Sequence, residues 1–394
     1  STDGLRNAGT AVFSEDVIVD ASNYTNGILN AGTLTANGSM NINATNMSAG
    51  GLVNWSGRVN VKKDLTITNN TTTAVNTSGI NISGGKVSVE GNTKVDVTGT
   101  ATNNMSNAYA AGIRVTGVNS IFESLGTNNT ITTTGMNAHG IYITNGTIAL
   151  GRTAPTTATG ATILLESGTV TTSGAGAHAV YANNATGNIT ITEGTAGVIK
   201  TTGATADGIE VVNNGTGKTI VTTSGTIATT GIGINTTNNS TAGDTTVSQT
   251  AGTITGSSGI HTSNSGVGNT TINTSGRVTG TSGFGISAVT SGSATGNTDI
   301  TNTGTVSGAT LGINAGTIGG SGNIKVTNTG TVSGGSGGIV TSQSGTGNTE
   351  AIIDGTVTGT NTTSDGVENI ISGTSSTGNI TVTQNSGTIT GGTN

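Results

Sequence analysis

The sequence predicts an all-β protein: a right-handed parallel β-helix (β-solenoid) with three short strands in each coil of about 26–27 residues and roughly 14–15 coils. One set of short sequence motifs recurs at a nearly fixed period, which is the signature of repeat architectures. Val and Ile alternate with polar residues at a period of two, which is typical of strands. The chain has 68 Gly but three Phe and one Trp in 394 residues. A conventional globular core needs more large side chains, whereas narrow stacked coils do not.

The period selects this repeat class. The second strand of each predicted coil begins with a small residue and an aliphatic one, and successive aliphatics are 25 to 29 residues apart. Blades of a β-propeller need longer repeats of four strands. The aliphatic positions are Val180, Ile209, Ile234, Ile260, Ile286, Ile313, Ile339 and Val367.

Each of the three predicted strands of a coil has its own sequence motif. The first reads Gly-Thr-Val or Gly-Thr-Ile, as in 252–256, 304–308, 330–334 and 355–359, and the second is the Gly-Ile strand described above. The third follows a Gly-Asn corner, and we expect Gly and Asn there because both tolerate positive φ. We also expect the corner asparagines to form side-chain ladders. These are Asn188, Asn269, Asn297, Asn323, Asn348 and Asn379.

The chain divides into two regions. We interpret residues 1–75, which carry most of the compositional variety, as an N-terminal cap and irregular first coils, because the end coils of solenoids are atypical. Residues 76–394 form the repeat array. The step from Ile141 to Val180 is 39 residues, and the only proline, Pro155, lies within it. This excess predicts an exposed loop near 151–162.

Composition excludes several classes of function. The chain has no Cys and a net charge of −6 without a basic run, so we expect no thiol chemistry and no nucleic-acid partner. No apolar segment approaches the length of a transmembrane helix. We assign no catalytic residues, no cofactor and no metal site. His139, His178 and His261 are interpreted as structural or solvated, because stacked histidines without a carboxylate partner do not make a site.

We call one position followed through successive coils a column. Two columns of outward residues lead to testable expectations. In the third strand, Asp299, Lys325 and Glu350 are expected to lie one above another. In the second strand, the residue after each inward aliphatic is expected to point outward. Aromatic and Arg side chains are the usual anchors of binding surfaces. We therefore predict a partner-binding patch at Arg114, Tyr142 and Tyr181, beside the loop near 151–162.

The repeat phrases resemble those of autotransporter passenger domains, the exported part of type V secretion proteins of Gram-negative bacteria. The resemblance rests on 302–308 followed by Gly312-Ile313, and on His139-Gly140-Ile141-Tyr142. It covers about 130 to 394 well and the first 130 residues loosely. It implies a right-handed β-helix on the cell surface, often adhesive. No protease triad is recognisable in the sequence.

The expected function is that of a non-enzymatic extracellular surface protein, an adhesin-type rod on the bacterial cell surface. Its expected partners are a protein or glycan on a host cell or another cell, or copies of itself end to end. A filament or surface-layer subunit is an alternative. Another is an ice-binding solenoid, since the Gly-Thr-Val strand presents Thr-x-Thr pairs such as Thr253/Thr255 and Thr356/Thr358. Arg277 and Ala228 interrupt that face.

Overall fold

The chain is an all-β parallel β-solenoid of about 13 turns, with about 27 residues per turn. A computed structural model describes residues 3–71, 77–99, 110–155, 160–184, 186–239, 241–292, 294–372 and 376–392, and these residues contain no helix. The turns are fewer than the 14–15 predicted because some turns are longer than the average. The paired residues Ile80 and Ile113 are 33 positions apart, and Ile141 and Val180 are 39 apart.

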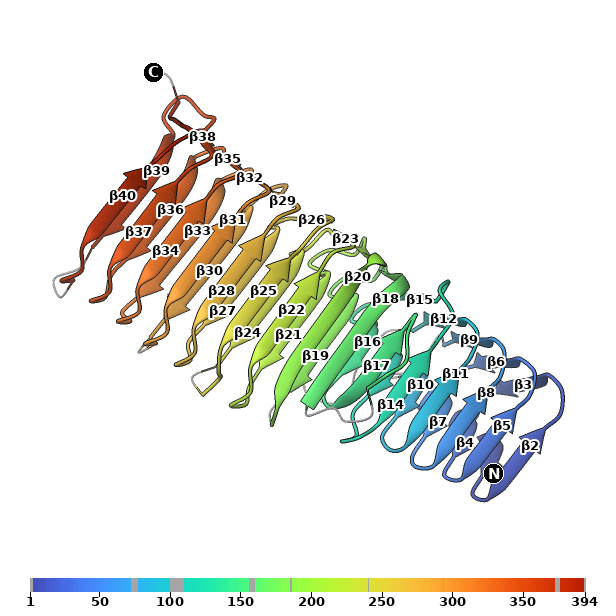
Figure 1. Cartoon of the computed structure of the whole chain (residues 1–394). Helices are drawn as coiled ribbons and strands as arrows, with labels where there is room; N and C mark the ends of the chain where they lie inside the picture. Colours follow the sequence, from blue (N-terminus) through green and yellow to red (C-terminus); the bar gives the residue numbers. More distant parts are fainter. Residues whose placement is uncertain are drawn as a thin grey trace. The chain divides into compact units, whose positions relative to one another are not determined.

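The chain forms two compact units. Unit 1 comprises Ser1–Asn184 and Thr190–Glu210, and unit 2 comprises Ala185–Ile189 and Val211–Asn394. In each unit one strand of every coil stacks in a first sheet, and the other two strands of the coil stack in a second sheet (Figure 1). Strands β20 (Asn188–Thr201) and β21 (Ile209–Asn213) contain residues of both units.

In unit 1 the first sheet pairs seven strands in parallel, each with the equivalent strand of the next coil. They are β1 (Asp3–Asn7), β4 (Asn26–Asn30), β7 (Gly50–Asn54), β10 (Ser78–Ile82), β13 (Ala111–Val115), β16 (His139–Ile143) and β19 (Val180–Asn184). The second sheet contains β2 (Thr10–Phe13), β3 (Val17–Ser22), β5 (Thr33–Ala36), β6 (Met40–Thr45), β8 (Arg58–Val61), β9 (Leu65–Asn70), β11 (Lys86–Val89), β12 (Thr93–Thr98), β14 (Ile121–Ser124), β15 (Thr130–Thr134), β17 (Gly146–Leu150) and β18 (Gly160–Thr172).

Unit 2 repeats this arrangement. Its first sheet contains β24 (Ile234–Asn238), β27 (Ile260–Asn264), β30 (Ile286–Ser291), β33 (Leu311–Ile318), β36 (Gly337–Gln343) and β39 (Asp365–Ile371). Its second sheet contains β22 (Thr219–Thr223), β23 (Thr226–Ala228), β25 (Thr245–Gln249), β26 (Thr253–Gly256), β28 (Thr270–Thr274), β29 (Arg277–Gly280), β31 (Thr298–Asn302), β32 (Thr305–Gly308), β34 (Ile324–Asn328), β35 (Thr331–Gly334), β37 (Thr349–Ile353), β38 (Thr356–Gly359), β40 (Ile380–Gln384) and β41 (Thr388–Thr390).

The core consists of aliphatic columns, as predicted. The Gly-Ile strands of unit 2 pair in the expected register, which stacks Ile260, Ile286, Ile313 and Ile339 on one another, and each of these side chains is 0% exposed. Val367 continues the column and is half-buried. Burial of an aliphatic side chain stabilises a fold by roughly 1.5–3 kcal/mol, so these columns replace the large residues that the chain lacks.

The Gly-Asn corners stack differently from the prediction. Gly268, Gly296 and Gly322 do not adopt positive φ. A Cβ atom at Gly322 would lie 1.9 Å from the carbonyl oxygen of Gly296, and a Cβ atom at Gly296 would lie 1.9 Å from that of Gly268. Glycine is therefore required because successive coils approach too closely for any side chain.

The Asn ladder exists, but it runs from side chain to backbone rather than from amide to amide. The backbone N–H of Asn323 donates to the side-chain oxygen of Asn297 at 2.9 Å, and Asn348 donates to Asn323 in the same way. Amide-to-amide bonds occur elsewhere, as between Asn7 and Asn30 at 2.8 Å.

The predicted charge column is confirmed. Asp299 pairs in register with Lys325, and Lys325 with Glu350. The Nζ atom of Lys325 lies 3.1 Å from a carboxylate oxygen of Glu350. Both side chains are partly exposed, so the pair contributes little to stability, about 0–1 kcal/mol.

The long step between Ile141 and Val180 contains extra strand as well as loop. The first part of β18 pairs with β17, through Ala161–Leu165, and its last part pairs with β15. This coil therefore contributes two strands, β17 and the first part of β18, to the row of the second sheet in which other coils have one. Because β18 begins at Gly160, residues 160–162 of the predicted loop are strand, and 156–159 lie outside the described residues. Glu123 fixes the start of the loop by accepting the backbone N–H of Ala154 at 3.1 Å.

The first coils of unit 1 consist of the same three strands as later coils, starting with β1 at Asp3. The cap expected within residues 1–75 stays a prediction, as does the right-handed sense of the solenoid.

Candidate functional site

Three successive coils of unit 1 enter the first sheet through the same turn. Asn137, Gly176 and Thr205 adopt φ of 55°, 65° and 55°, and each lies two residues before one of the positions 139, 178 and 207. Positive φ is uncommon for a β-branched residue such as Thr205. This turn places residues 139, 178 and 207 at equivalent positions, where the sequence provides His139, His178 and Asp207.

A threonine at the end of the preceding strand fixes each turn. Thr133 Oγ1 donates to the carbonyl of Ala138 at 2.6 Å, and Thr201 Oγ1 donates to that of Ala206 at 2.6 Å. Thr172 makes the equivalent bond to Ala177. The side chains that follow these turns are therefore held on the same rigid framework in each coil.

A ladder of hydrogen bonds links the three positions. The backbone N–H of His178 donates to Nδ1 of His139 at 3.1 Å, and the backbone N–H of Asp207 donates to Nδ1 of His178 at 3.0 Å. Since Nδ1 of His178 accepts a hydrogen bond, the neutral ring carries its proton on Nε2.

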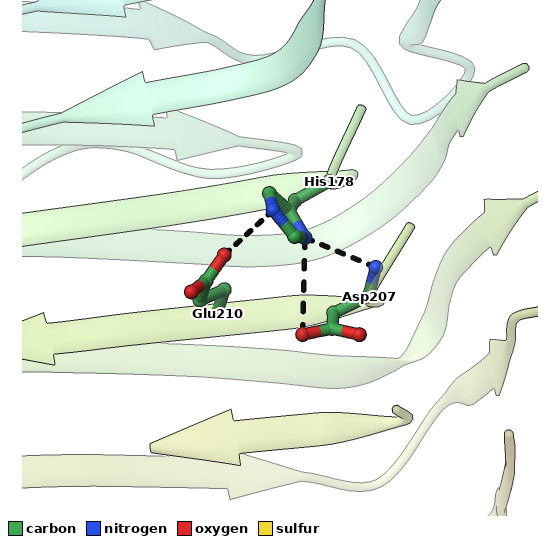
Figure 2. Close-up of side chains that lie close together, drawn as sticks. All are labelled: His178, Asp207 and Glu210. Atoms are coloured by element: carbon green, nitrogen blue, oxygen red, sulfur yellow. Dashed lines mark hydrogen bonds and ion pairs between the residues drawn. The ribbon is translucent and has the colours of Figure 1, made fainter. Parts of the chain in front are cut away.

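Nε2 of His178 faces a carboxylate. It lies 2.6 Å from Oε2 of Glu210, and Nδ1 lies 3.9 Å from Oδ2 of Asp207 (Figure 2). The three side chains are 16%, 22% and 9% exposed for His178, Glu210 and Asp207, respectively. One nitrogen of His178, one oxygen of Asp207 and one of Glu210 lie within 4.8 Å of one another, and this combination is the one group of potential metal ligands found among the described residues. We call these three residues the His178 cluster.

Aromatic rings and a guanidinium group adjoin the His178 cluster. The rings of His139 and His178 stack with centroids 5.2 Å apart, and Tyr181 lies 4.9 Å from His139 and 5.8 Å from His178. Tyr142 and Tyr181 lie 5.6 Å apart, and the guanidinium carbon of Arg114 lies 5.6 Å from the centroid of the Tyr142 ring. That separation is within the range of a cation–π interaction.

The structure brings together the three residues predicted for partner binding, which we call the aromatic patch. Arg114, Tyr142 and Tyr181 are in register on β13, β16 and β19. One part of the prediction differs: Tyr142 is 2% exposed rather than presented to solvent. Arg114 stacks on its ring and Tyr181 packs against it, so Tyr142 supports the patch. Arg114 and Tyr181 are half-buried and provide its accessible surface.

Burial shifts two pKa values in this region. Desolvation, with the neighbouring His178 second, holds the pKa of His139 well below its ordinary value, against an opposing hydrogen bond from the His178 backbone. His139 is therefore neutral at pH 7. Desolvation also lowers the pKa of Arg114, and Tyr142 opposes that effect. An arginine remains charged despite such a shift.

Sequence reasoning missed Asp207 and Glu210. His178 was interpreted as structural because no carboxylate partner was recognised, but two carboxylates lie on the next coil. The signal was present in the coil alignment, where Asp207-Gly208-Ile209-Glu210 follows the pattern of His139-Gly140-Ile141-Tyr142. The two patterns place the ionisable residues in the same two columns. The third histidine, His261, is half-buried and pairs in register with Asn235 and Ser287.

Comparison with protein-family models, with curated proteins and with solved structures found no match to this chain. The resemblance to autotransporter passenger domains is therefore supported at the level of a β-solenoid fold. A search of the described residues found no helix suited to spanning a membrane.

Proposed function

We propose that this protein is a non-enzymatic extracellular surface protein of the adhesin type, in which the solenoid presents the aromatic patch to a protein or glycan on another cell. The observation that supports this proposal best is the concentration of rare side chains. Aromatic residues make up 2% of the chain, yet two of its four tyrosines stand in successive coils beside Arg114. The equivalent column of unit 2 includes Asn235, Ser287 and Asn314.

The chemistry of the patch suits recognition. Tyrosine offers a ring face for sugar or apolar groups and a hydroxyl for hydrogen bonds. Arg114 is held in place by Tyr142 and by a hydrogen bond from Nη1 to Asn81 at 3.2 Å. Immobilised side chains lose less conformational entropy when a partner binds. The patch is thus preorganised for a partner with hydroxyl or carboxylate groups.

Attachment of the purified chain to cultured host cells and to a glycan array tests the proposal. We expect saturable attachment that excess unlabelled protein reduces. Attachment no greater than that of a non-adhesive β-solenoid of similar charge, on cells and glycans alike, would rule the proposal out.

A second candidate function, ice binding, is favoured by one observation in unit 2. Thr305, Thr331, Thr356 and Thr388 pair in register, as do Ser307, Ser333, Thr358 and Thr390 in the neighbouring column. Two parallel rows of hydroxyl groups, with methyl groups at the threonines, form a regular array. Arg277 occupies the same column as Thr305 and interrupts it. Measurement of thermal hysteresis tests this candidate, and freezing behaviour equal to that of a control protein excludes it.

A further inference from the structure

We propose that the His178 cluster binds one divalent transition-metal ion such as Zn²⁺, with Nε2 of His178 and the carboxylate of Glu210 as ligands and Asp207 beside them. This inference goes beyond the proposed function, and its tests do not depend on attachment. It starts from the 2.6 Å separation of Nε2 and Glu210 Oε2, and from the position of Asp207 on the other side of the same ring (Figure 2).

The donor set selects the class of ion. Imidazole nitrogen together with carboxylate oxygen suits Zn²⁺ and neighbouring transition metals, whereas Ca²⁺ and Mg²⁺ prefer oxygen ligands alone. Two carboxylates beside one imidazole also give the cluster a negative charge.

An ion would occupy the place that the Nε2 proton has now. Bonds of about 2.0–2.2 Å from Zn²⁺ to nitrogen and oxygen place two tetrahedral ligands roughly 3.4 Å apart. The distance between Nε2 of His178 and Oε2 of Glu210 must therefore increase from its present 2.6 Å by somewhat less than ~1 Å. Glu210 is 22% exposed on its side chain and ends on three rotatable bonds, so a small rotation achieves this separation.

Asp207 completes the arrangement from the second side of the ring. A histidine that binds a metal through one nitrogen usually donates its other N–H to a carboxylate or carbonyl group. When the proton moves from Nε2 to Nδ1, the backbone N–H of Asp207 is no longer a suitable partner, but its carboxylate is. That carboxylate is 3.9 Å from Nδ1, which a small shift of the side chain converts into a hydrogen bond. Water completes the coordination of the ion.

The test is a calorimetric titration of the full chain with ZnCl₂ after treatment with a chelator and dialysis. We expect one Zn²⁺ per chain. His178→Asn and Glu210→Gln should each weaken binding at least tenfold, and Asp207→Asn should weaken it by about 10–100-fold, as is typical for a residue that orients a ligand. The absorption spectrum of bound Co²⁺ should indicate nitrogen and oxygen ligands.

His261→Asn is the matched control, because it removes a half-buried histidine of unit 2 that, among the described residues, belongs to no group of potential metal ligands. It should leave Zn²⁺ binding unchanged. Glu210→Gln keeps the shape of the side chain and serves as the decisive variant if His178→Asn does not fold, as judged by circular dichroism. Absence of Zn²⁺ binding at millimolar concentration, parental affinity in Glu210→Gln, or loss of binding in His261→Asn would each overturn the proposal.

Discussion

Replacement of Ile313 by alanine tests the energetic basis of the solenoid. Ile313 is 0% exposed and stacks between Ile286 and Ile339 in the aliphatic column of unit 2. Truncation of a buried Ile to Ala costs about 2–5 kcal/mol, through lost burial and the cavity that remains. We expect the upper half of that range, because parallel strands on both sides fix the backbone and limit collapse into the cavity.

Urea unfolding followed by circular dichroism measures this change. Ile313→Val removes one methylene group and should cost about 0.5–1.5 kcal/mol, which gives a graded comparison. Thr331→Ala, at an exposed position of the same unit, should stay within about 0.5 kcal/mol of the parent. An Ile313→Ala variant that unfolds at the same urea concentration as Thr331→Ala would refute the claim that the column supplies the core.

Three further predictions address the corners, the loop anchor and the charge column. Gly322→Ala should destabilise unit 2 by about 1–3 kcal/mol, because the new Cβ would lie 1.9 Å from the carbonyl oxygen of Gly296. Gly9→Ala should be tolerated, because a Cβ at that position meets no atom within 4 Å. Equal urea midpoints for the two variants would contradict the stacking explanation. Burial tends to raise the pKa of Glu123, but hydrogen bonds from Lys86, Ser88 and Ala154 outweigh it and hold that pKa below its usual range. Its stabilising contribution is therefore complete above the unfolded-state pKa of about 4.3 and is lost as the pH falls through the folded value. The urea midpoint of the parent should fall more steeply between pH 5 and pH 3, two conditions we choose, than that of Glu123→Gln, and parallel profiles would argue against this anchor. Lys325→Ala should change the free energy of unfolding by about 1 kcal/mol or less, and a larger loss would mean that the ion pair with Glu350 is more than a surface contact.

The sequence was sufficient to predict the repeat, the strand register and the inward columns. Register follows from alternation, since a shift by one residue would expose every aliphatic side chain. The column of Ile260, Ile286, Ile313 and Ile339 and the column of Asp299, Lys325 and Glu350 were therefore both placed correctly.

Two features of the candidate site were beyond this reasoning for physical reasons. Alternation predicts that the Tyr142 side chain points outward, but it does not predict which side chains cover its ring. Arg114 and Tyr181 pack around the Tyr142 ring and bury it. The partnership of His178 with Asp207 and Glu210 depends on contact between successive coils, 29 and 32 residues apart in the chain. A search for ligands within one coil does not find it, whereas a search down the columns does.

The most direct test of the proposed function is the attachment of a Tyr181→Ser variant to the cells or glycans that bind the parent chain. Tyr181 is the more accessible tyrosine of the aromatic patch, and its replacement leaves the buried Tyr142 in place. Thr331→Ala in unit 2 provides the control, with circular dichroism to verify folding of both variants. The account predicts at least a tenfold loss of attachment for Tyr181→Ser and none for Thr331→Ala. Parental attachment by a folded Tyr181→Ser variant would contradict it.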